Sequence, residues 1–141
     1  MKRIFNTDLP GNSGHVALLI FRVIAAIFML THGIPKLQKL LSGAEIQFAD
    51  PYGLGPTVSF VLVIFAEFLC SLLVILGLAT RLAVIPLMIT VATAVIFAHA
   101  DDPFGTKEKP LLFLLIFALL CVFGSGRYSV DRILEKRNSW F

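Results

Sequence analysis

The sequence predicts an all-α integral membrane protein, in which a bundle of four transmembrane helices is followed by a short cytoplasmic amphipathic helix. Three observations support this fold class. The 141 residues are 57% hydrophobic and 15% charged, whereas soluble domains usually contain about 25% charged residues. The mean hydropathy is +0.88. The apolar residues form long runs without the alternation of a membrane β-barrel, which leaves helices as the way to satisfy the backbone in lipid.

Four apolar segments account for the predicted helices of what we expect to be a single domain over residues 1–141. They lie at about residues 14–32, 57–79, 82–100 and 108–124. A bilayer core of about 30 Å takes roughly 17–25 helical residues, which the second and third segments supply directly. No small-x-small cleavage site follows the first segment, so we expect it to stay in the membrane. The fourth has a shorter apolar run, and we expect its helix to begin near Lys107 with Pro110 in the first turn.

The links between these segments also carry structural signals. The short link from Gly77 to Arg81 predicts that the second and third helices form an antiparallel hairpin. Apolar residues at helical spacing from Ile34 to Leu41 either continue the first helix or lie at the membrane interface. The run from Pro51 to Pro56 predicts an ordered turn. Beyond Gly124-Ser125-Gly126 we expect a short helix that Ser129 caps. The basic residues of this helix suit anionic lipid headgroups.

Lysine and arginine are unevenly divided between the two ends of the predicted helices. Cytoplasmic loops of membrane proteins carry the excess of these residues, so the richer end marks the cytoplasmic side. That end holds the N-terminus and seven basic residues, against four at the other end, so both termini are predicted to be cytoplasmic. The seven are Lys2, Arg3, Arg81, Arg127, Arg132, Lys136 and Arg137, and the four are Lys36, Lys39, Lys107 and Lys109.

The net charge of +3 does not indicate a nucleic-acid partner, because no basic run is interleaved with aromatic residues. Cys70 and Cys121 form no C-x-x-C pair, and both lie in apolar segments. We interpret them as core residues, with a redox pair as the open alternative. The sequence does not fix whether the two cysteines lie near each other.

Two charges interrupt the apolar segments, Arg22 in the first and Glu67 in the second. An ionisable side chain at the centre of a membrane helix costs roughly 2.5–3.5 kcal/mol, so such residues usually face the bundle interior and find a partner. At 1.5 Å per residue the depths of these two differ by about 8 Å, which an arginine side chain can span. We expect an Arg22–Glu67 pair that either braces the helices or lines a ligand or proton route. The remaining alternative is an Arg22 side chain that reaches away from Glu67.

A second polar group lies toward the other end of these helices. His32 and Lys36 share a helix face if the first helix continues through Pro35, and His99 closes the third segment. These three would line a pocket with Glu67 at its floor. The sequence has no closely spaced His and Glu motif of the kind that binds a metal, so we expect neither a metal ion nor a haem. The alternative to a pocket role is that the histidines lie at the membrane interface and form hydrogen bonds there. The candidates for ligand binding or proton handling are therefore Arg22, His32, Lys36, Glu67 and His99, with Asp101 and Asp102 as secondary candidates.

The order and spacing of these residues resemble the DoxX family of small bacterial membrane proteins. The shared features are Arg22, His32-Gly33 with Lys36, Glu67, the run Leu76 to Arg81, and a closing run from Gly124 to Asp131. The closing run is similar to the family's Gly-x-Gly-x-x-Ser-x-Asp pattern, and the resemblance extends from about residue 17 to residue 134. It implies a four-helix bundle in the bacterial cytoplasmic (inner) membrane, an association with a quinone-linked oxidoreductase, and a shared polar set of Arg22, His32, Lys36 and Glu67.

We therefore expect a membrane protein that binds a quinone or quinol, either as a redox component or as an accessory subunit of a membrane oxidoreductase. Lys36 or His32 would hydrogen-bond a quinone oxygen, and Glu67 with Arg22 would handle or balance a proton. The alternative is a non-catalytic scaffold, or a module that binds lipid or a small solute, with Arg22 and Glu67 as a brace. The sequence leaves open whether the chain is an enzyme, what its substrate is and whether it forms homo-oligomers.

Overall fold

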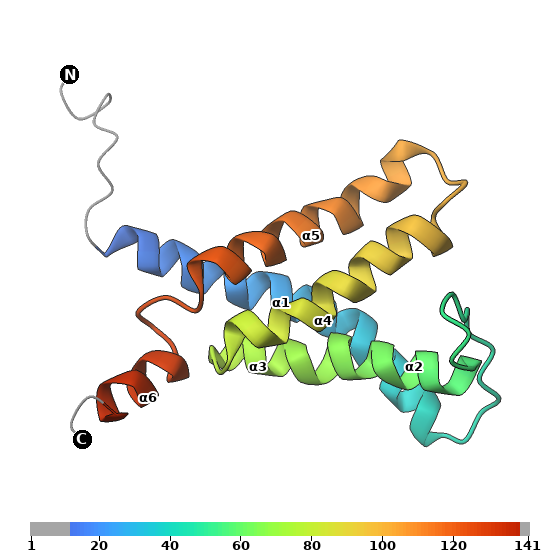
Figure 1. The fold of residues 1–141 in the computed structure, drawn as a ribbon, viewed down its shortest axis with the longest axis horizontal. Helices are drawn as coiled ribbons and strands as arrows, with labels where there is room; N and C mark the ends of the chain where they lie inside the picture. The colour runs from blue at the N-terminus through green and yellow to red at the C-terminus, as the bar shows by residue number, and fades with distance from the viewer. Residues whose placement is uncertain (1–11, 139–141) are drawn as a thin grey trace.

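The computed structural model describes residues 12–138 and is all-helical over that range (Figure 1). Two of the long helices change from α-helical to π-helical geometry along their length, so each is divided into labelled parts. In chain order the elements are α1 (Ser13–Leu41), α2 (Pro56–Ile64), η1 (Phe65–Cys70), α3 (Ser71–Leu76), α4 (Thr80–Thr93), η2 (Ala94–Ala98), α5 (Phe104–Phe123) and α6 (Val130–Asn138).

The connecting segments gather at two opposite ends of the molecule (Figure 1). We call one the terminal end, because it holds the start of α1, the α3–α4 turn, the α5–α6 loop and α6. The other is the loop end, with the α1–α2 loop at residues 42–55 and the α4–α5 loop at residues 99–103. The α3–α4 turn closes with the Leu78 amide donating to the Leu73 carbonyl at 3.0 Å, and the predicted hairpin of the second and third helices is confirmed.

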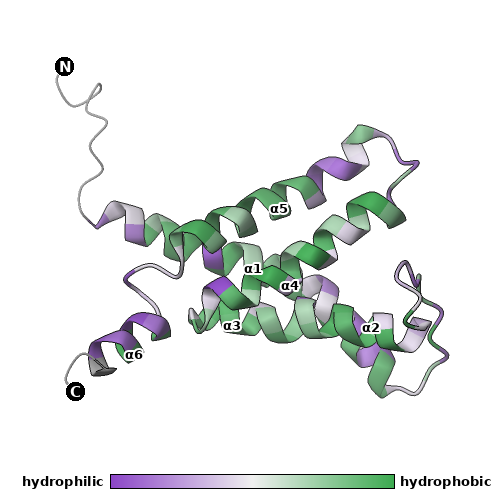
Figure 2. Cartoon of the chain, in the orientation of Figure 1, coloured by the Kyte–Doolittle hydropathy of each residue, from purple (hydrophilic) through white to green (hydrophobic). Residues whose placement is uncertain are grey.

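Within residues 12–138, three helices are long and apolar enough to cross a membrane: Ser13–Leu41, Pro56–Leu76 and Thr80–Ala98. The prediction of an all-α membrane architecture is confirmed to that extent. α5 has 20 residues, and its early charged run, Lys107 to Lys109, stands out as a hydrophilic band on an otherwise apolar helix (Figure 2). A fourth crossing by α5 therefore remains a prediction. Lys2 and Arg3, which contributed to the predicted orientation, lie outside the described residues.

The core lies where α1, α3, α4 and α5 meet. Its centre includes Ala26 of α1, Val74 of α3, Leu87 of α4 and Phe117 of α5, each fully buried, with Ala25 and Ala83 as further small residues of the cluster. Small residues allow helices to approach closely in a membrane, where packing rather than water exclusion drives helix association. Cys70 is buried in this cluster and Cys121 packs against it, which agrees with their interpretation as core residues.

Two predicted boundaries need correction. α1 continues through Pro35 to Leu41 instead of ending near residue 32, so the amphipathic stretch extends the helix. α5 begins at Phe104, so Pro110 lies inside the helix, and its expected place in the first turn is wrong. Pro103 has extended backbone angles (φ −62°, ψ 155°) and is the N-cap, which fixes the helix start there. The residues from Phe104 to Thr106 then form a first turn that the apolar pattern did not reveal.

Gly33 brings α1 unusually close to η1. A Cβ atom at this position would lie 2.8 Å from the carbonyl carbon of Glu67 and 2.9 Å from the amide nitrogen of Phe68. We expect Gly33→Ala to force the helices apart and lower the free energy of unfolding by about 1–3 kcal/mol, measured by unfolding in mixed micelles. Gly14→Ala is the matched control, because a Cβ there meets nothing within 4 Å. Equal stability of the two variants would show that this close approach is not required.

Candidate functional site

The expected pair of Arg22 and Glu67 does not form. Arg22 is 1% exposed, and its guanidinium donates to backbone carbonyl oxygens at the terminal end. The acceptors are Ser125 at 2.5 Å, Tyr128 at 2.9 Å and Ile75 at 3.4 Å. Of the alternatives drawn from the sequence, the structure agrees with an Arg22 side chain that reaches away from Glu67. Arg22 thus joins α1 to the end of α3 and to the α5–α6 loop.

The direction of helical side chains explains this outcome. Side chains of an α-helix lean toward its N-terminus, so Arg22 points back toward the start of α1. The level of Glu67 on α1 is marked by Gly33, eleven residues further along, which corresponds to roughly 16 Å. The depth comparison from the sequence placed the two residues about 8 Å apart because it took the ends of the first two helices to lie at one level, whereas Arg22 lies level with Ile75 and Gly77 at the end of α3. Arg22 and Glu67 therefore belong to different ends of the molecule.

Glu67 pairs instead with Lys36. The Nζ atom of Lys36 lies 2.6 Å from Oε1 and 2.5 Å from Oε2 of Glu67. The Glu67 side chain is 8% exposed and that of Lys36 is 28% exposed, so the pair is shielded on the carboxylate side and open on the ammonium side. Lys36 follows Gly33 by three residues on the same face of α1, and its backward lean brings Nζ to the level of Glu67.

This ion pair forms one wall of a pocket near the loop end, which we call the Lys36–Glu67 pocket. Its volume is about 290 Å³. Both π-helical stretches line it, with Glu67 in η1 and Phe97 in η2, and π-helical turns in α-helices are frequently found at functional sites. Apart from the ion pair the lining is mainly apolar and aromatic. It comprises Phe48, Ala49, Pro51, Tyr52, Leu54, Ser59, Leu62, Val63, Ile89, Thr90, Thr93, Ala94, Phe97 and Ala98.

The α1–α2 loop covers part of this pocket through Tyr52. The Tyr52 hydroxyl lies 2.6 Å from Oγ1 of Thr93 on α4, and its ring makes an edge contact with Phe97 at a centroid distance of 5.9 Å. The predicted turn from Pro51 to Pro56 is thereby held against the third helix. Tyr52 and Thr93 were not among the candidates from the sequence. The only signal for Tyr52 was an aromatic residue inside a turn rich in proline and glycine.

Asp50 fixes that turn. Its carboxylate accepts hydrogen bonds from Oγ of Ser59 at 2.8 Å and from the amides of Gly55 at 2.7 Å and Leu54 at 2.9 Å. These bonds, the one from Ser59 foremost, lower the pKa of Asp50 below its ordinary value. The carboxylate therefore stabilises the start of α2 and the loop that carries Tyr52.

The lowered pKa of Asp50 predicts the pH range in which this loop is ordered. Because the folded pKa lies below the unfolded value of about 3.9, ionised Asp50 contributes its full stabilisation above that pH, and the contribution is lost as the pH falls through the folded pKa. We expect Asp50→Asn to reduce the hydrogen-exchange protection of the Leu54 and Gly55 amides at pH 7. Asp101→Asn is the control, since Asp101 is exposed. Unchanged protection in Asp50→Asn would contradict this role.

The remaining predicted residues lie outside the Lys36–Glu67 pocket. His32 is exposed, because it lies about 100° around α1 from the inward-facing Gly33. His99 follows η2, and its Nδ1 atom is 2.6 Å from Oδ2 of Asp102. Asp101 is exposed in the α4–α5 loop. The expectation that His32 and His99 line one pocket with Lys36 is therefore wrong. Within residues 12–138, no three His, Cys, Asp or Glu side chains are grouped as a metal site.

The closing run of the sequence builds the terminal end. Asp131 caps α4 across space: its Oδ1 accepts from the Ala79 amide at 2.6 Å and its Oδ2 from the Thr80 amide at 3.2 Å. Its own amide donates to the Gly77 carbonyl at 2.9 Å. Ser129 accepts from the Arg132 amide at 3.3 Å at the start of α6, the position at which the sequence suggested a cap. The run from Gly124 to Asp131 thus ties α6 to Arg22 and to the α3–α4 turn.

The DoxX family model matches residues 17–100. The chain belongs to the DoxX family. It is a membrane protein with apolar helices, and the matched region contains Arg22, Lys36 and Glu67 but ends before α5.

Several curated relatives align over most of their length. The chain is 31% identical over 127 residues to "Putative oxidoreductase CatD" of Bacillus subtilis, covering 89% of this chain and 92% of that protein. It is 32% identical over 127 residues to "Inner membrane protein YqjF" of Escherichia coli, covering 86% and 95%. An uncharacterized membrane protein of Mycobacterium tuberculosis is 28% identical over 149 residues, covering 88% and 85%. No solved structure matches the chain significantly.

Proposed function

We propose that this DoxX-family protein binds a quinone or quinol in the Lys36–Glu67 pocket and acts with a membrane oxidoreductase, as a redox component or an accessory subunit. The observation that carries the proposal is a charged hydrogen-bonding pair at one wall of a pocket whose lining is mainly apolar and aromatic. A quinone headgroup combines a flat apolar ring with two carbonyl oxygens, which this arrangement suits. The B. subtilis relative with the name "Putative oxidoreductase CatD" supports the redox assignment.

The two members of the pair suit different states of the ligand. Lysine has three donor hydrogens and no acceptor, so Lys36 would donate to a quinone carbonyl oxygen. An ionised glutamate only accepts, so Glu67 would accept a hydrogen bond from a quinol hydroxyl. Conversion between the two takes up or releases two electrons and two protons, the electrons being exchanged with the partner oxidoreductase. The pocket of about 290 Å³ is near the lower end for ligand pockets and fits one ring with the beginning of its tail.

We further propose four membrane spans in the cytoplasmic (inner) membrane of a bacterium, with both termini cytoplasmic. α5 would be the fourth span, its Lys107 and Lys109 reaching to the interface along their apolar stems. The relative described as an inner membrane protein of E. coli supports this location. A reporter that fluoresces only in the cytoplasm, fused after Phe141, is expected to fluoresce. With an odd number of spans, this fusion would not fluoresce. A reporter that is active only in the periplasm, fused at the same position, would then be active.

Ligand binding is tested with the purified full chain in detergent and a soluble short-tail quinone titrated by calorimetry. Removing a charge-assisted hydrogen bond costs about 1.5–3 kcal/mol, so Lys36→Met is expected to weaken binding by roughly 10-fold to 100-fold. Lys39→Met is the matched control, because Lys39 is exposed one turn further along α1 and does not line the pocket. No binding by the wild type, or equal binding by both variants, would overturn the proposal.

The alternative of a module that binds lipid or a small solute without redox chemistry uses the same pocket. It is favoured by the mainly apolar lining. The two functions separate in one experiment, in which a reduced quinone is added to the protein reconstituted with its host membrane fraction. Faster quinol oxidation that depends on Lys36 supports the redox role. Binding without any change in oxidation rate supports the solute-binding role.

A further inference from the structure

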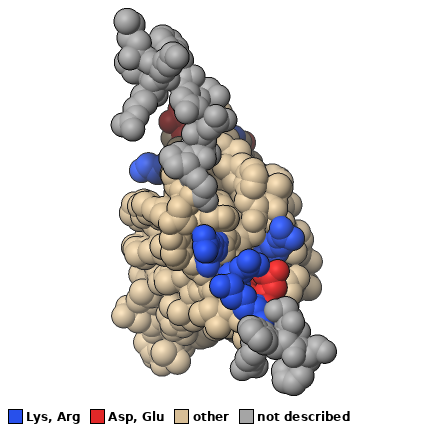
Figure 3. Space-filling model, turned by 90° about the vertical axis from the view of Figure 1, so that its left-hand side faces the viewer, with Lys and Arg blue, Asp and Glu red and all other residues tan. Residues whose placement is uncertain are grey.

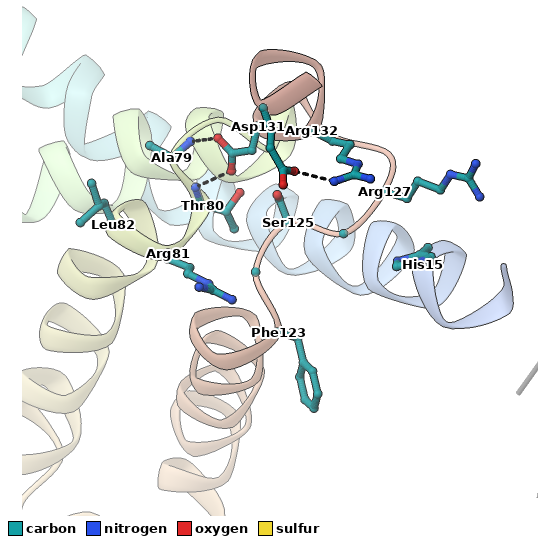
Figure 4. A pocket seen from close by; sticks show the side chains of 13 residues that line it. His15, Ala79, Thr80, Arg81, Leu82, Phe123, Ser125, Arg127, Asp131 and Arg132 are labelled. Carbon is teal, nitrogen blue, oxygen red and sulfur yellow. Dashed lines mark hydrogen bonds and ion pairs between the residues drawn. The ribbon is translucent and has the colours of Figure 1, made fainter. Parts of the chain in front are cut away.

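A second pocket, unrelated to the Lys36–Glu67 pocket, opens at the terminal end. We call it the basic pocket. Its volume is about 740 Å³, and it is lined by the start of α1, the α3–α4 turn, the α5–α6 loop and α6 (Figure 4). Four of its lining residues are basic: His15, Arg81, Arg127 and Arg132. Figure 3 looks onto this end of the molecule, where Lys and Arg side chains gather with few acidic side chains among them.

The acidic side chains in this pocket are already engaged within the protein. Asp131 uses both carboxylate oxygens on the amides of Ala79 and Thr80. Glu135 is paired with Arg132 at 2.6 Å. Neither carboxylate therefore compensates the other cations that face the opening.

Those other cations have hydrogen-bonding capacity to spare. Arg81 donates from one nitrogen to the Val122 carbonyl at 3.2 Å, and its guanidinium lies beside Gly124. Arg127 is exposed and has no hydrogen bond or ion pair within residues 12–138. The Nδ1 atom of His15 is buried without a hydrogen-bond partner among the described residues. Three segments distant in sequence thus bring polar groups with unused hydrogen-bonding capacity to the lining of one pocket.

We propose that the basic pocket binds a phosphate group. Guanidinium groups match phosphate oxygens with paired, charge-assisted hydrogen bonds, and basic pockets at the ends of membrane helices bind lipid headgroups. The phosphate comes either from an anionic phospholipid, whose headgroup would lie at this depth, or from a soluble phosphate compound. This proposal does not depend on the quinone assignment, because it concerns the opposite end of the molecule.

The test is native mass spectrometry of the full chain in neutral detergent, with phosphatidylglycerol or phosphatidylcholine added at equal concentration. A preference for phosphatidylglycerol is expected, and Arg127→Gln should reduce the bound fraction of this lipid by about fivefold. Lys109→Gln removes the same charge at the loop end and should leave binding unchanged. In a parallel arm, inorganic phosphate is added in a thermal unfolding assay.

The arms distinguish the two sources of phosphate. Binding of phosphatidylglycerol with no effect of inorganic phosphate assigns the pocket to a lipid headgroup. Thermal stabilisation by inorganic phosphate that is lost in Arg127→Gln assigns it to a soluble phosphate compound. Equal loss of binding in Arg127→Gln and Lys109→Gln would overturn the proposal, because it would indicate only a general attraction of charge. Absence of both effects in the wild type would overturn it as well.

Discussion

Replacing Arg22 with methionine is expected to lower the free energy of unfolding by about 3–5 kcal/mol, a larger loss than we expect for either member of the Lys36–Glu67 pair. The substitution removes the donor shared by the carbonyls of Ser125, Tyr128 and Ile75, and leaves them without that partner in a partly buried position. There is also no free space between Gly77 and the Arg22 guanidinium, because a Cβ atom at Gly77 would lie 2.5 Å from Nη1. Reversible unfolding in mixed micelles measures the loss.

Arg22→Lys separates charge from geometry. An ammonium is a point charge on a shorter stem and cannot reach three carbonyls that surround a planar guanidinium, so lysine should recover less than half of the lost stability. Lys109→Met is the control, because it removes an exposed charge at the other end of α5. Wild-type stability in Arg22→Lys would mean that the residue supplies charge alone. Wild-type stability in Arg22→Met would mean that Arg22 does not join α1 to the end of α3 and to the α5–α6 loop.

Breaking the Lys36–Glu67 pair is expected to give the second largest effect. Lys36→Met leaves a carboxylate that is 8% exposed without its partner, at a cost of about 3 kcal/mol. Glu67→Gln should cost less, because the ammonium of Lys36 is the more exposed partner. The double variant should be more stable than the sum of the single losses predicts, with a coupling energy of about 1–3 kcal/mol.

The same cycle applied to Arg22 and Glu67 provides the control. These residues share no contact, so their losses should add within about 0.5 kcal/mol. Coupling between Arg22 and Glu67, together with none between Lys36 and Glu67, would contradict the pairing seen in the structure.

The membrane-embedded residues could be recognised from the sequence, but their partners could not. Arg22 and Glu67 stood out because charges are expensive in apolar segments, and Lys36 stood out because it would share a helix face with His32. Which of these residues pair depends on where each helix begins and ends and on the direction in which its side chains lean. The first helix was expected to end near residue 32, which would leave Lys36 outside it. Once α1 is extended to Leu41, Lys36 becomes part of a membrane-length helix and can pair with Glu67.

Other features of the structure have only a weak sequence signal, or none. The π-helical geometry of η1 and η2 has no signature in an apolar run, since every residue there is compatible with an ordinary α-helix. The cap that Asp131 provides to α4 joins residues about 50 positions apart, which local capping patterns do not detect. His32 and His99 were chosen for their chemistry and for their place at the same end of the helices as Lys36, but helix rotation and the end of η2 place both away from the pocket.

The most direct test of the central claim is photolabelling of the full-length protein in its membrane with a photoreactive quinone analogue, followed by peptide mapping. If the quinone binds in the Lys36–Glu67 pocket, adducts are expected at Phe48 to Val63 and at Ile89 to Ala98, the segments that line it. Excess unmodified quinone should abolish these adducts, and Lys36→Met should reduce them while Lys39→Met does not. Adducts confined to other segments, or labelling that resists competition, would contradict a quinone site in this pocket.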